Sequence, residues 1–178
     1  MRIGLDIDDT FTETKKAFRR SFKKYQKKYN STKERIENLN YEEYKEFLKE
    51  YGEAIYFKVK EKKNASKVVR KWIKEGHQIY FVTARSKDYF EKMEEYTKKY
   101  FIKRDIQYEH IFFGVRNKYE CIKDLNLDLF IDDQEKVLDS FPKDKLTLLK
   151  MIPDKNNYSK YEKVTNWKEI EELVKTMH

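Results

Sequence analysis

The sequence predicts an α/β fold, a doubly wound parallel sheet of about five strands with a small helical cap inserted after the first strand. From residue 64 onward, short apolar runs alternate with amphipathic segments, which is typical of parallel strands covered by helices on both faces. Before residue 64, one apolar run at 3–7 is followed by about fifty residues of helical character. We therefore expect a core of residues 1–12 and 64–178 and a cap of residues 13–63.

The first apolar run, at residues 3–7, is short and bounded by carboxylates, which predicts a buried strand. Within the cap, aromatic residues recur at spacings of 4, 3 and 4, so they form one stripe along a helix between pairs of basic residues. The stripe consists of Phe18, Phe22, Tyr25 and Tyr29. Further helices are expected at about 41–51 and 53–63.

The second half alternates regularly between helices and strands. Asn64 precedes an amphipathic segment and Gly76 follows it, positions that suit a helix N-cap and the residue beyond a helix end. Asn166 and Glu169 resemble a capping box at the start of the final helix. Between these two helices we expect strands at 78–83, 110–113, 128–131 and 146–151, separated by helices at about 87–101 and 118–125 and one short helix.

The composition is that of a folded protein without a membrane segment. Charged residues make up 40% of the 178 residues, yet 16% are aromatic and apolar runs recur, which argues against disorder. No stretch of about 18 apolar residues is present to span a bilayer. Three carboxylates within the first nine residues argue against a secretory leader, and the single cysteine, Cys121, excludes an intramolecular disulfide. We expect a cytoplasmic protein with no membrane partner.

The excess positive charge lies in one segment. The chain has 40 Lys and Arg against 32 Asp and Glu, and residues 15–28 alone contain eight basic and no acidic side chains. The rest of the chain is therefore neutral. The simplest interpretation is a solvated helix face. Two alternatives are steering of small anionic substrates toward a nearby site and binding of a nucleic-acid backbone.

Two carboxylates follow the first expected strand. Asp6 and Asp8 are two residues apart, so in an extended chain both point to the same side. Converging carboxylates repel each other unless a cation or a shared proton offsets their charge. Hard oxygen ligands in a sparse arrangement suit Mg²⁺, which often binds a substrate phosphate as well. The sequence therefore predicts a magnesium site at the end of this strand.

Three further polar clusters are expected at the same edge of the sheet, where ligands bind in such folds. Thr83 ends another strand and offers a hydroxyl, with neighbouring backbone N–H groups, to an anion. Lys118 offers a compact positive charge for phosphate oxygens. Asp132 and Asp133 end a later strand, and as neighbours they face opposite ways. We expect one of the two to bind the metal and the other to support it.

These clusters, taken in order, resemble the motifs of the haloacid dehalogenase-like (HAD) superfamily of phosphohydrolases, which have a Rossmann-like core. The matching segments are Leu5-Asp6-Ile7-Asp8-Asp9-Thr10, Val82-Thr83-Ala84-Arg85, Lys118 and Phe130-Ile131-Asp132-Asp133. The resemblance implies that Asp6 is the nucleophile, attacking phosphorus to form an aspartyl-phosphate. It implies that Asp8 protonates the leaving group and then activates water.

The same resemblance implies the other ligands of the site. Mg²⁺ would be bound by Asp6, by the carbonyl of Asp8 and by Asp133, with Asp132 beside it. The phosphate would be bound by Thr83, Ala84 and Lys118. The inserted helical block would be a cap of the kind placed just after the first motif.

Within the superfamily, the chain is similar to the 5′(3′)-deoxyribonucleotidases and the small bacterial nucleotidase-like proteins. The tail carries this likeness, from Asn157-Tyr158 through residues 161–167 into the last helix. Thr83-Ala84-Arg85 replaces the Thr-Ser-Pro common in the animal deoxyribonucleotidases, and Asp9 stands where many members have Gly. The resemblance implies a 5′-nucleotidase acting on (deoxy)nucleoside monophosphates, so the expected partner is a small phosphorylated substrate.

Two residues are candidates for contact with the rest of the substrate. Phe11, next to the first motif, is our candidate for stacking on a nucleobase, whereas Phe18 and Phe22 are expected to pack within the cap. Arg85 is a candidate for contact with phosphate or ribose, with an ion pair at a helix N-terminus as the alternative. Two other functions stay open: a polynucleotide-end phosphatase that uses the basic helix, and a non-enzymatic phosphoacceptor or nucleotide-binding protein.

Overall fold

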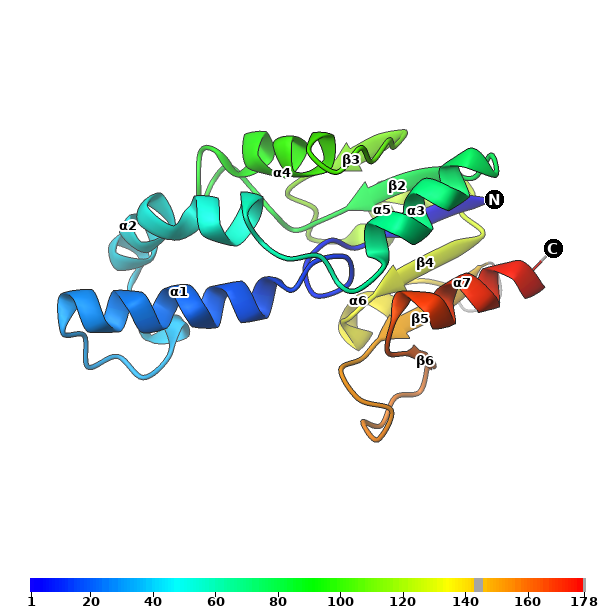
Figure 1. Cartoon of the computed structure of the whole chain (residues 1–178). Helices are drawn as coiled ribbons and strands as arrows, with labels where there is room; N and C mark the ends of the chain where they lie inside the picture. The colour runs from blue at the N-terminus through cyan, green and yellow to red at the C-terminus, as the bar shows by residue number, and fades with distance from the viewer. Residues whose placement is uncertain (143–145, 178) are drawn as a thin grey trace.

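Six parallel strands form one sheet in the computed structural model, which describes residues 1–142 and 146–177 (Figure 1). The sheet has the order β3-β2-β1-β4-β5-β6. The strands are β1 (Arg2–Leu5), β2 (Gln78–Val82), β3 (His110–Phe112), β4 (Leu129–Asp132), β5 (Thr147–Met151) and β6 (Glu162–Val164). The predicted α/β class and parallel sheet are confirmed, with six strands instead of about five. The edge strand β6 escaped prediction because it is three residues long and buries only Val164.

The strand order reverses at β1. The chain first builds outward from β1 to β2 and β3, and then returns to place β4 on the other side of β1. In an open parallel sheet, the crevice for ligands lies beyond the carboxyl ends of the strands at such a reversal. The ends of β1 and β4 therefore define the place where the site should lie.

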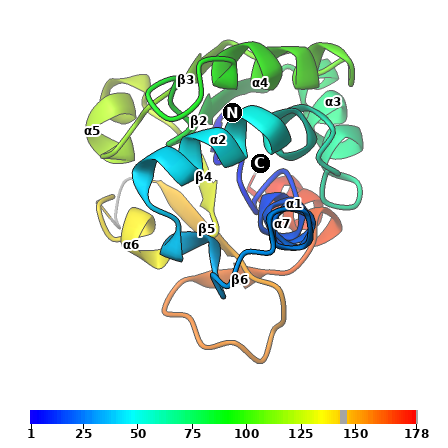
Figure 2. The same ribbon diagram turned by 90° about the vertical axis from the view of Figure 1, so that its left-hand side faces the viewer.

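Helices cover both faces of the sheet (Figure 2). On one face lie α3 (Ala65–Lys74) and α7 (Trp167–Thr176), and on the other lie the short helices α5 (Lys118–Ile122) and α6 (Glu135–Leu138). A further helix, α4 (Met93–Ile102), packs Tyr100 and Phe101 into the same core as α3 and α7. Burial on both faces explains why the strands consist of continuous apolar runs in the sequence.

Alternate residues of β2 enter different cores. Ile79 and Phe81 join the core under α3 and α7, while Val82 joins the core under α5 and α6. In β1, Gly4 lies where a Cβ would be 2.6 Å from the Phe130 ring, so only glycine lets this ring cover the strand. The close approach of Phe130 keeps β1 and β4 packed beside the site.

The segment between β1 and α3 is helical and projects beyond the carboxyl ends of the strands (Figure 1). It contains α1 (Thr14–Tyr29), a 3₁₀ turn at Ile36–Asn38, α2 (Tyr41–Gly52) and a π-helical turn at Glu53–Phe57. Within α1, the buried residues are Thr14, Ala17, Ser21 and Phe22, whereas the basic side chains are exposed. Our division into a core and a cap at residues 12/13 and 63/64 stays a prediction.

The helix expected over 53–63 is wrong beyond residue 57. Residues 58–63 are not helical, and they pair with the segment that follows β1, where the N–H of Glu13 donates to Lys60 and the N–H of Lys62 donates to Phe11, each at 2.8 Å. This pairing joins residues about fifty positions apart, so local propensity could not reveal it. Two hydrogen-bonded linkers thus connect the helical segment to the sheet.

Three other local expectations need correction. The helix expected from residue 87 starts at Met93, because Ser86 accepts the N–H of Asp88 and forms a turn first. Asn64 precedes α3 but makes no side-chain capping bond. Asn166 does cap α7, accepting from two backbone N–H groups, while Glu169 binds Thr165 instead of closing the capping box.

Among the described residues, no helix combines the length and the apolar character needed to cross a bilayer.

Candidate active site

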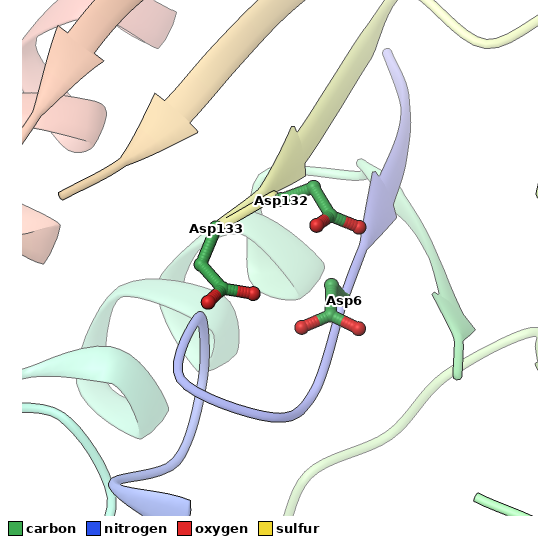
Figure 3. A group of neighbouring side chains, drawn as sticks. All are labelled: Asp6, Asp132 and Asp133. Atoms are coloured by element: carbon green, nitrogen blue, oxygen red, sulfur yellow. The ribbon is translucent and has the colours of Figure 1, made fainter. Parts of the chain in front are cut away.

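Three aspartates converge at the carboxyl ends of the two central strands (Figure 3). Asp6 follows β1 directly, Asp132 is the last residue of β4, and Asp133 comes next. One carboxylate oxygen of each residue lies within 4.8 Å of the others. Since β1 and β4 are hydrogen-bonded neighbours, residues far apart in the chain reach the same place. The structure thus brings together the first and last predicted clusters.

Lys118 neutralises part of this negative charge. Its Nζ donates to Asp6 Oδ1 at 2.5 Å and to Asp132 Oδ2 at 2.7 Å, and its side chain is almost fully buried. Burial alone would lower the pKa of Lys118, but the two carboxylates outweigh it and hold that pKa above its usual value. Lys118 starts α5, whose preceding residue, Asn117, caps the helix. The lysine therefore stays charged between Asp6 and Asp132.

Two oxygen atoms in the cluster are left without partners among the described residues. These are Asp6 Oδ2 and Asp133 Oδ1, both buried. Burial raises the pKa of Asp6 well above its usual value; Lys118 opposes this shift, and Asp132, Asp8 and Asp133 add to it. Buried, unpaired carboxylate oxygens are costly unless a cation binds them. The donor set therefore fits a hard divalent cation such as Mg²⁺.

Asp132 and Asp133 differ in whether a carboxylate oxygen is left without a hydrogen-bond partner. Asp132 uses both oxygens, accepting from Lys118 and from the N–H of Gln134 at 2.8 Å. Asp133 accepts from Lys15 through Oδ2 at 2.7 Å, and its Oδ1 is the unpartnered atom. The geometry therefore favours Asp133 over Asp132 as a metal ligand.

Asp8 lies apart from the three-aspartate cluster and is held by other groups. Its Oδ1 accepts from Thr14 at 2.6 Å and from Arg85 Nη2 at 2.7 Å, and Arg85 Nε contacts both carboxylate oxygens at 3.1 Å. Burial would raise the pKa of Asp8, but the charge of Arg85 and the hydrogen bonds from Arg85 and Thr14 lower it below its usual value. Asp8 is thus oriented by two residues from different segments of the chain.

The guanidinium group of Arg85 is bound entirely by other residues of the protein. Its side chain is 2% exposed, its Nη1 donates to Thr97 at 2.9 Å, and its guanidinium lies 5.0 Å from the centre of the Tyr56 ring. The ion pair that we considered as an alternative exists, but its partner is Asp8. The prediction that Arg85 contacts phosphate or ribose is therefore not supported, because all three nitrogens of its guanidinium already have partners.

Thr83 and Ala84 follow β2 at the same edge of the sheet. Thr83 is fully buried and its hydroxyl accepts the N–H of Arg85 at 3.2 Å, whereas Ala84 is exposed. β2 lies beside β1, so this segment follows the strand next to Asp6. The phosphate-binding roles of Thr83, Ala84 and Lys118 stay predictions.

Phe11 is not available to a substrate. It is fully buried, and its ring packs against Phe81, Phe101 and Trp167, each with centroids 5.5 Å apart. The prediction that Phe11 stacks on a base is wrong because the chain turns back at Asp9 and directs the ring into the core. Phe18 is half-buried and packs against Phe47, as expected for a residue of the helical stripe.

The turn at Asp9 explains why this chain departs from the glycine of related motifs. Asp9 has φ of 61°, the left-handed region that Gly occupies most easily and Asp tolerates. Its carboxylate accepts the N–H of Lys15 at 3.1 Å, in the first turn of α1, where Glu13 provides no capping bond. Asp9 therefore acts as the missing cap.

Sequence reasoning missed several residues around Asp8. Thr14 holds Asp8 and Lys15 bridges Asp133 and Asp9, although Lys15 had been counted only as part of the basic segment. The cavity beside Asp8, of about 300 Å³, is also lined by tyrosines that belong to no motif. They are Tyr44, Tyr56 and Tyr89. Only their tertiary position marks them, so no signal in the sequence would have singled them out.

Comparison with known proteins agrees with this fold. No protein-family model matches the chain. A predicted nucleotidase of Oceanobacillus iheyensis is 30% identical over 94% of this chain and 95% of its own length. A predicted nucleotidase of Bacillus cereus is 25% identical over 98% of both chains.

Solved structures share the fold at lower sequence identity. A predicted β-phosphoglucomutase of Thermotoga maritima superposes with a TM-score of 0.69 at 12% identity, covering 99% of both chains. A predicted phosphatase of Clostridium acetobutylicum gives 0.66 at 14%, covering 98% of both. The hydrolase YfnB of Bacillus subtilis, solved with bound magnesium, gives 0.64 at 13%, also covering 98% of both.

The sheet order and the solved structures define a HAD fold, and the 30% identical nucleotidase-named relative places the chain among phosphohydrolases of that fold. Within that class, the chain belongs to the family of bacterial nucleotidase-like HAD proteins represented by the relatives from Oceanobacillus and Bacillus. Membership in a family of hydrolases favours an enzyme over the non-enzymatic phosphoacceptor considered above.

Proposed function

We propose that this protein is a Mg²⁺-dependent phosphomonoesterase that acts through an aspartyl-phosphate intermediate, and that its substrates are (deoxy)nucleoside 5′-monophosphates. The observation that carries the proposal is the buried, unpartnered Oδ2 of Asp6 beside Lys118 and Asp133. A carboxylate oxygen without a hydrogen-bond partner retains the lone pairs that a nucleophile needs.

In the first step, a carboxylate oxygen of Asp6 attacks phosphorus, and the bond between phosphorus and the ester oxygen breaks. Arg85 and Thr14 lower the pKa of Asp8 in the free site, so the step requires the negative charge of the bound phosphate to raise that pKa again. The protonated Asp8 then gives its proton to the departing oxygen, so that a nucleoside with a free hydroxyl leaves. In the second step, Asp8 takes a proton from water, whose oxygen attacks the phosphorus of the aspartyl-phosphate. The acyl-phosphate bond then breaks, which releases inorganic phosphate and restores Asp6.

Asp6 and Asp8, together with other residues, would bind the metal ion and the phosphate. Asp6, Asp133 and the main-chain carbonyl of Asp8 would hold Mg²⁺, which when bound supplies positive charge to the phosphate oxygens. Lys118 adds a second positive charge, and Asp132 keeps the lysine in place through its 2.7 Å contact. Thr83 and the backbone at Ala84 would bind a phosphate oxygen.

A nucleoside as the leaving group is supported by the names of the relatives and by the cavity beside Asp8. The relatives from Oceanobacillus iheyensis and Bacillus cereus are named as nucleotidases. The cavity beside Asp8 is lined by Phe18, Tyr44, Tyr56 and Tyr89, whose aromatic rings are suited to a nucleobase.

The test is phosphate release from a panel of phosphate esters. Purified protein with Mg²⁺ is incubated with nucleoside 5′-monophosphates, 3′-monophosphates and sugar phosphates, and free phosphate is measured. We expect the highest kcat/KM for 5′-monophosphates. If a folded protein releases phosphate from sugar phosphates but from no nucleotide, the nucleotidase assignment is wrong while the phosphatase chemistry stands.

Arg85→Lys is expected to lower kcat/KM for a nucleoside monophosphate about 100-fold, within the range that general acid catalysis contributes. Lysine keeps the positive charge but loses the fork that contacts both oxygens of Asp8 and also reaches Thr97. Asp8 is then poorly oriented toward the leaving oxygen. We expect a smaller loss for p-nitrophenyl phosphate, because its phenolate leaves without full protonation.

The comparison of the two substrates separates positioning of Asp8 from general damage. The matched control is Arg104→Lys, another arginine that stacks on a tyrosine but contacts the backbone of Val59, away from Asp8. It should change neither the rates nor their ratio substantially. Equal losses for both substrates in Arg85→Lys would contradict a positioning role for Arg85.

A further inference from the structure

A second hollow adjoins the cavity beside Asp8. It measures about 920 Å³ and lies between α1, the loop at 31–40 and the start of α2. Lys15, Phe18 and Tyr44 line both this groove and the cavity beside Asp8, so the two hollows adjoin each other. The cavity alone, at about 300 Å³, is at the lower limit for an organic ligand. The adjoining groove offers room for the parts of a substrate that this cavity would not hold.

One face of α1 forms a wall of the groove and has two parallel rows of side chains. Lys15, Arg19 and Lys23 recur every four residues, with steps of about 6 Å along the helix. Phe18 and Phe22 form the neighbouring row. The row of cations begins at the catalytic end, where the Lys15 amine lies 2.7 Å from Asp133. Positive charge and aromatic surface thus continue together away from the site.

The outer cations of this row are free to bind an anion. Within the described part of the chain, no carboxylate lies within ion-pair distance of Arg19 or Lys23, whereas nearby Lys16 and Lys28 each have a glutamate partner. The opposite wall contributes Arg35 but also Glu34 and Glu37. Including Lys15, the groove has four cations against two carboxylates. A neutral nucleoside would leave this excess of positive charge unused.

We propose that the groove binds a second phosphate on the leaving group, so that the preferred substrate is a nucleotide carrying one phosphate beyond the one that is removed. The scissile phosphate lies at Asp6, the base lies against Phe18 and Tyr44, and the second phosphate lies between Arg19 and Lys23. This inference rests on the proposed function. The same chemistry has two sources, a free nucleoside 3′,5′-bisphosphate and the phosphorylated 5′ end of an oligonucleotide.

The first experiment measures the ratio of kcat/KM for adenosine 3′,5′-bisphosphate to that for adenosine 5′-monophosphate. We expect a ratio of about 10 or more in the wild-type protein, because charge-assisted contacts to phosphate are strong. In the double variant Arg19→Gln/Lys23→Gln the ratio should fall to about one. The matched control is Arg20→Gln/Lys24→Gln, which removes the same charges from α1 at exposed residues that do not line the groove.

The control distinguishes a binding site from the general field of a basic helix. Long-range steering depends on total charge, so it would make both double variants fall alike. That result, or a wild-type ratio near one, overturns the proposal. A third substrate, a 5′-phosphorylated decanucleotide, identifies the source: a kcat/KM above that of the bisphosphate assigns the groove to oligonucleotide ends, and a lower value assigns it to the free nucleotide.

A binding measurement separates failure of this inference from failure of the nucleotidase assignment. Calorimetric titration of the protein with adenosine 3′,5′-bisphosphate and with the monophosphate needs no turnover. If no nucleotide is hydrolysed but the bisphosphate binds about tenfold more tightly than the monophosphate, and only Arg19→Gln/Lys23→Gln removes the difference, the groove stands and the reaction is misassigned. If monophosphates are hydrolysed and the two affinities are equal, the groove proposal is wrong.

Discussion

Asp6→Asn is expected to lower kcat by a factor on the order of 10⁴ or more for every phosphate ester that the protein hydrolyses. The amide has nearly the shape of the carboxylate, but it carries no negative charge: its nitrogen lone pair is delocalised into the carbonyl and its neutral oxygen is a poor nucleophile. Asp6 Oδ2 is the buried atom without a hydrogen-bond partner, and no other described carboxylate offers an equivalent atom between Lys118 and Asp133. No neighbouring group can therefore replace it.

The fold should survive this substitution. Lys118 keeps its contact with Asp132 at 2.7 Å, and one of several mutually repelling carboxylates is removed. Steady-state phosphate release measures the loss, and circular dichroism verifies that the variant is folded. The matched control is Asp124→Asn, the same change at an exposed position remote from the cluster, which should retain full activity. Residual turnover above a few per cent of wild type in Asp6→Asn would mean that another residue is the nucleophile.

Removal of divalent cations with EDTA is expected to reduce activity to the background of Asp6→Asn, and excess Mg²⁺ should restore it. Asp6, Asp132 and Asp133 place three carboxylates within 4.8 Å, and Lys118 and Lys15 together supply only two positive charges. Without a cation, burial and the neighbouring charges raise the pKa of Asp6 and favour its protonated form, which is a poor nucleophile. An unchanged rate in EDTA would contradict the proposed metal dependence.

A binding measurement tests the metal site without using activity. Mg²⁺ that binds the folded protein raises its thermal unfolding midpoint, and the stabilisation grows with the logarithm of the Mg²⁺ concentration relative to Kd. We expect Asp133→Asn to increase the Mg²⁺ concentration needed for this rise by about tenfold or more, because Asp133 Oδ1 is the unpartnered oxygen. Asp124→Asn should not change it. If Asp132→Asn weakens Mg²⁺ binding while Asp133→Asn does not, the assignment of the two residues is reversed.

Much of the site follows from sequence because parallel strands end at a common edge. The apolar runs before Asp6 and Asp132 identified two buried strands, and alternation with helices indicated that the strands are parallel. Residues at the carboxyl ends of such strands must lie near one another, whatever the loops do. The convergence of Asp6, Asp132 and Asp133 is the outcome of that rule.

The orientation of individual side chains could not be predicted from the sequence. Phe11 is adjacent to the motif, but the left-handed backbone at Asp9 turns its ring toward Phe81 and the core. Arg85 lies in the motif after β2, yet its partner, Asp8, is 77 residues away and is reached only after two loops are in place. Both outcomes depend on contacts between distant segments, which local propensity and periodicity do not encode.

The sequence by itself determined the parallel sheet, the helical segment after the first strand and the set of polar residues at the strand ends. These depend on the period of apolar residues and on local backbone preference, both of which are properties of neighbouring positions. Only the tertiary structure decided that Asp8 is held by Arg85 and that Asp133 keeps an oxygen without a hydrogen-bond partner. It also decided that the basic face of α1 lines a groove beside the Asp8 cavity. Those features arise where segments distant in the chain pack together. The energy of such packing depends on both segments, so neither segment's own sequence determines it.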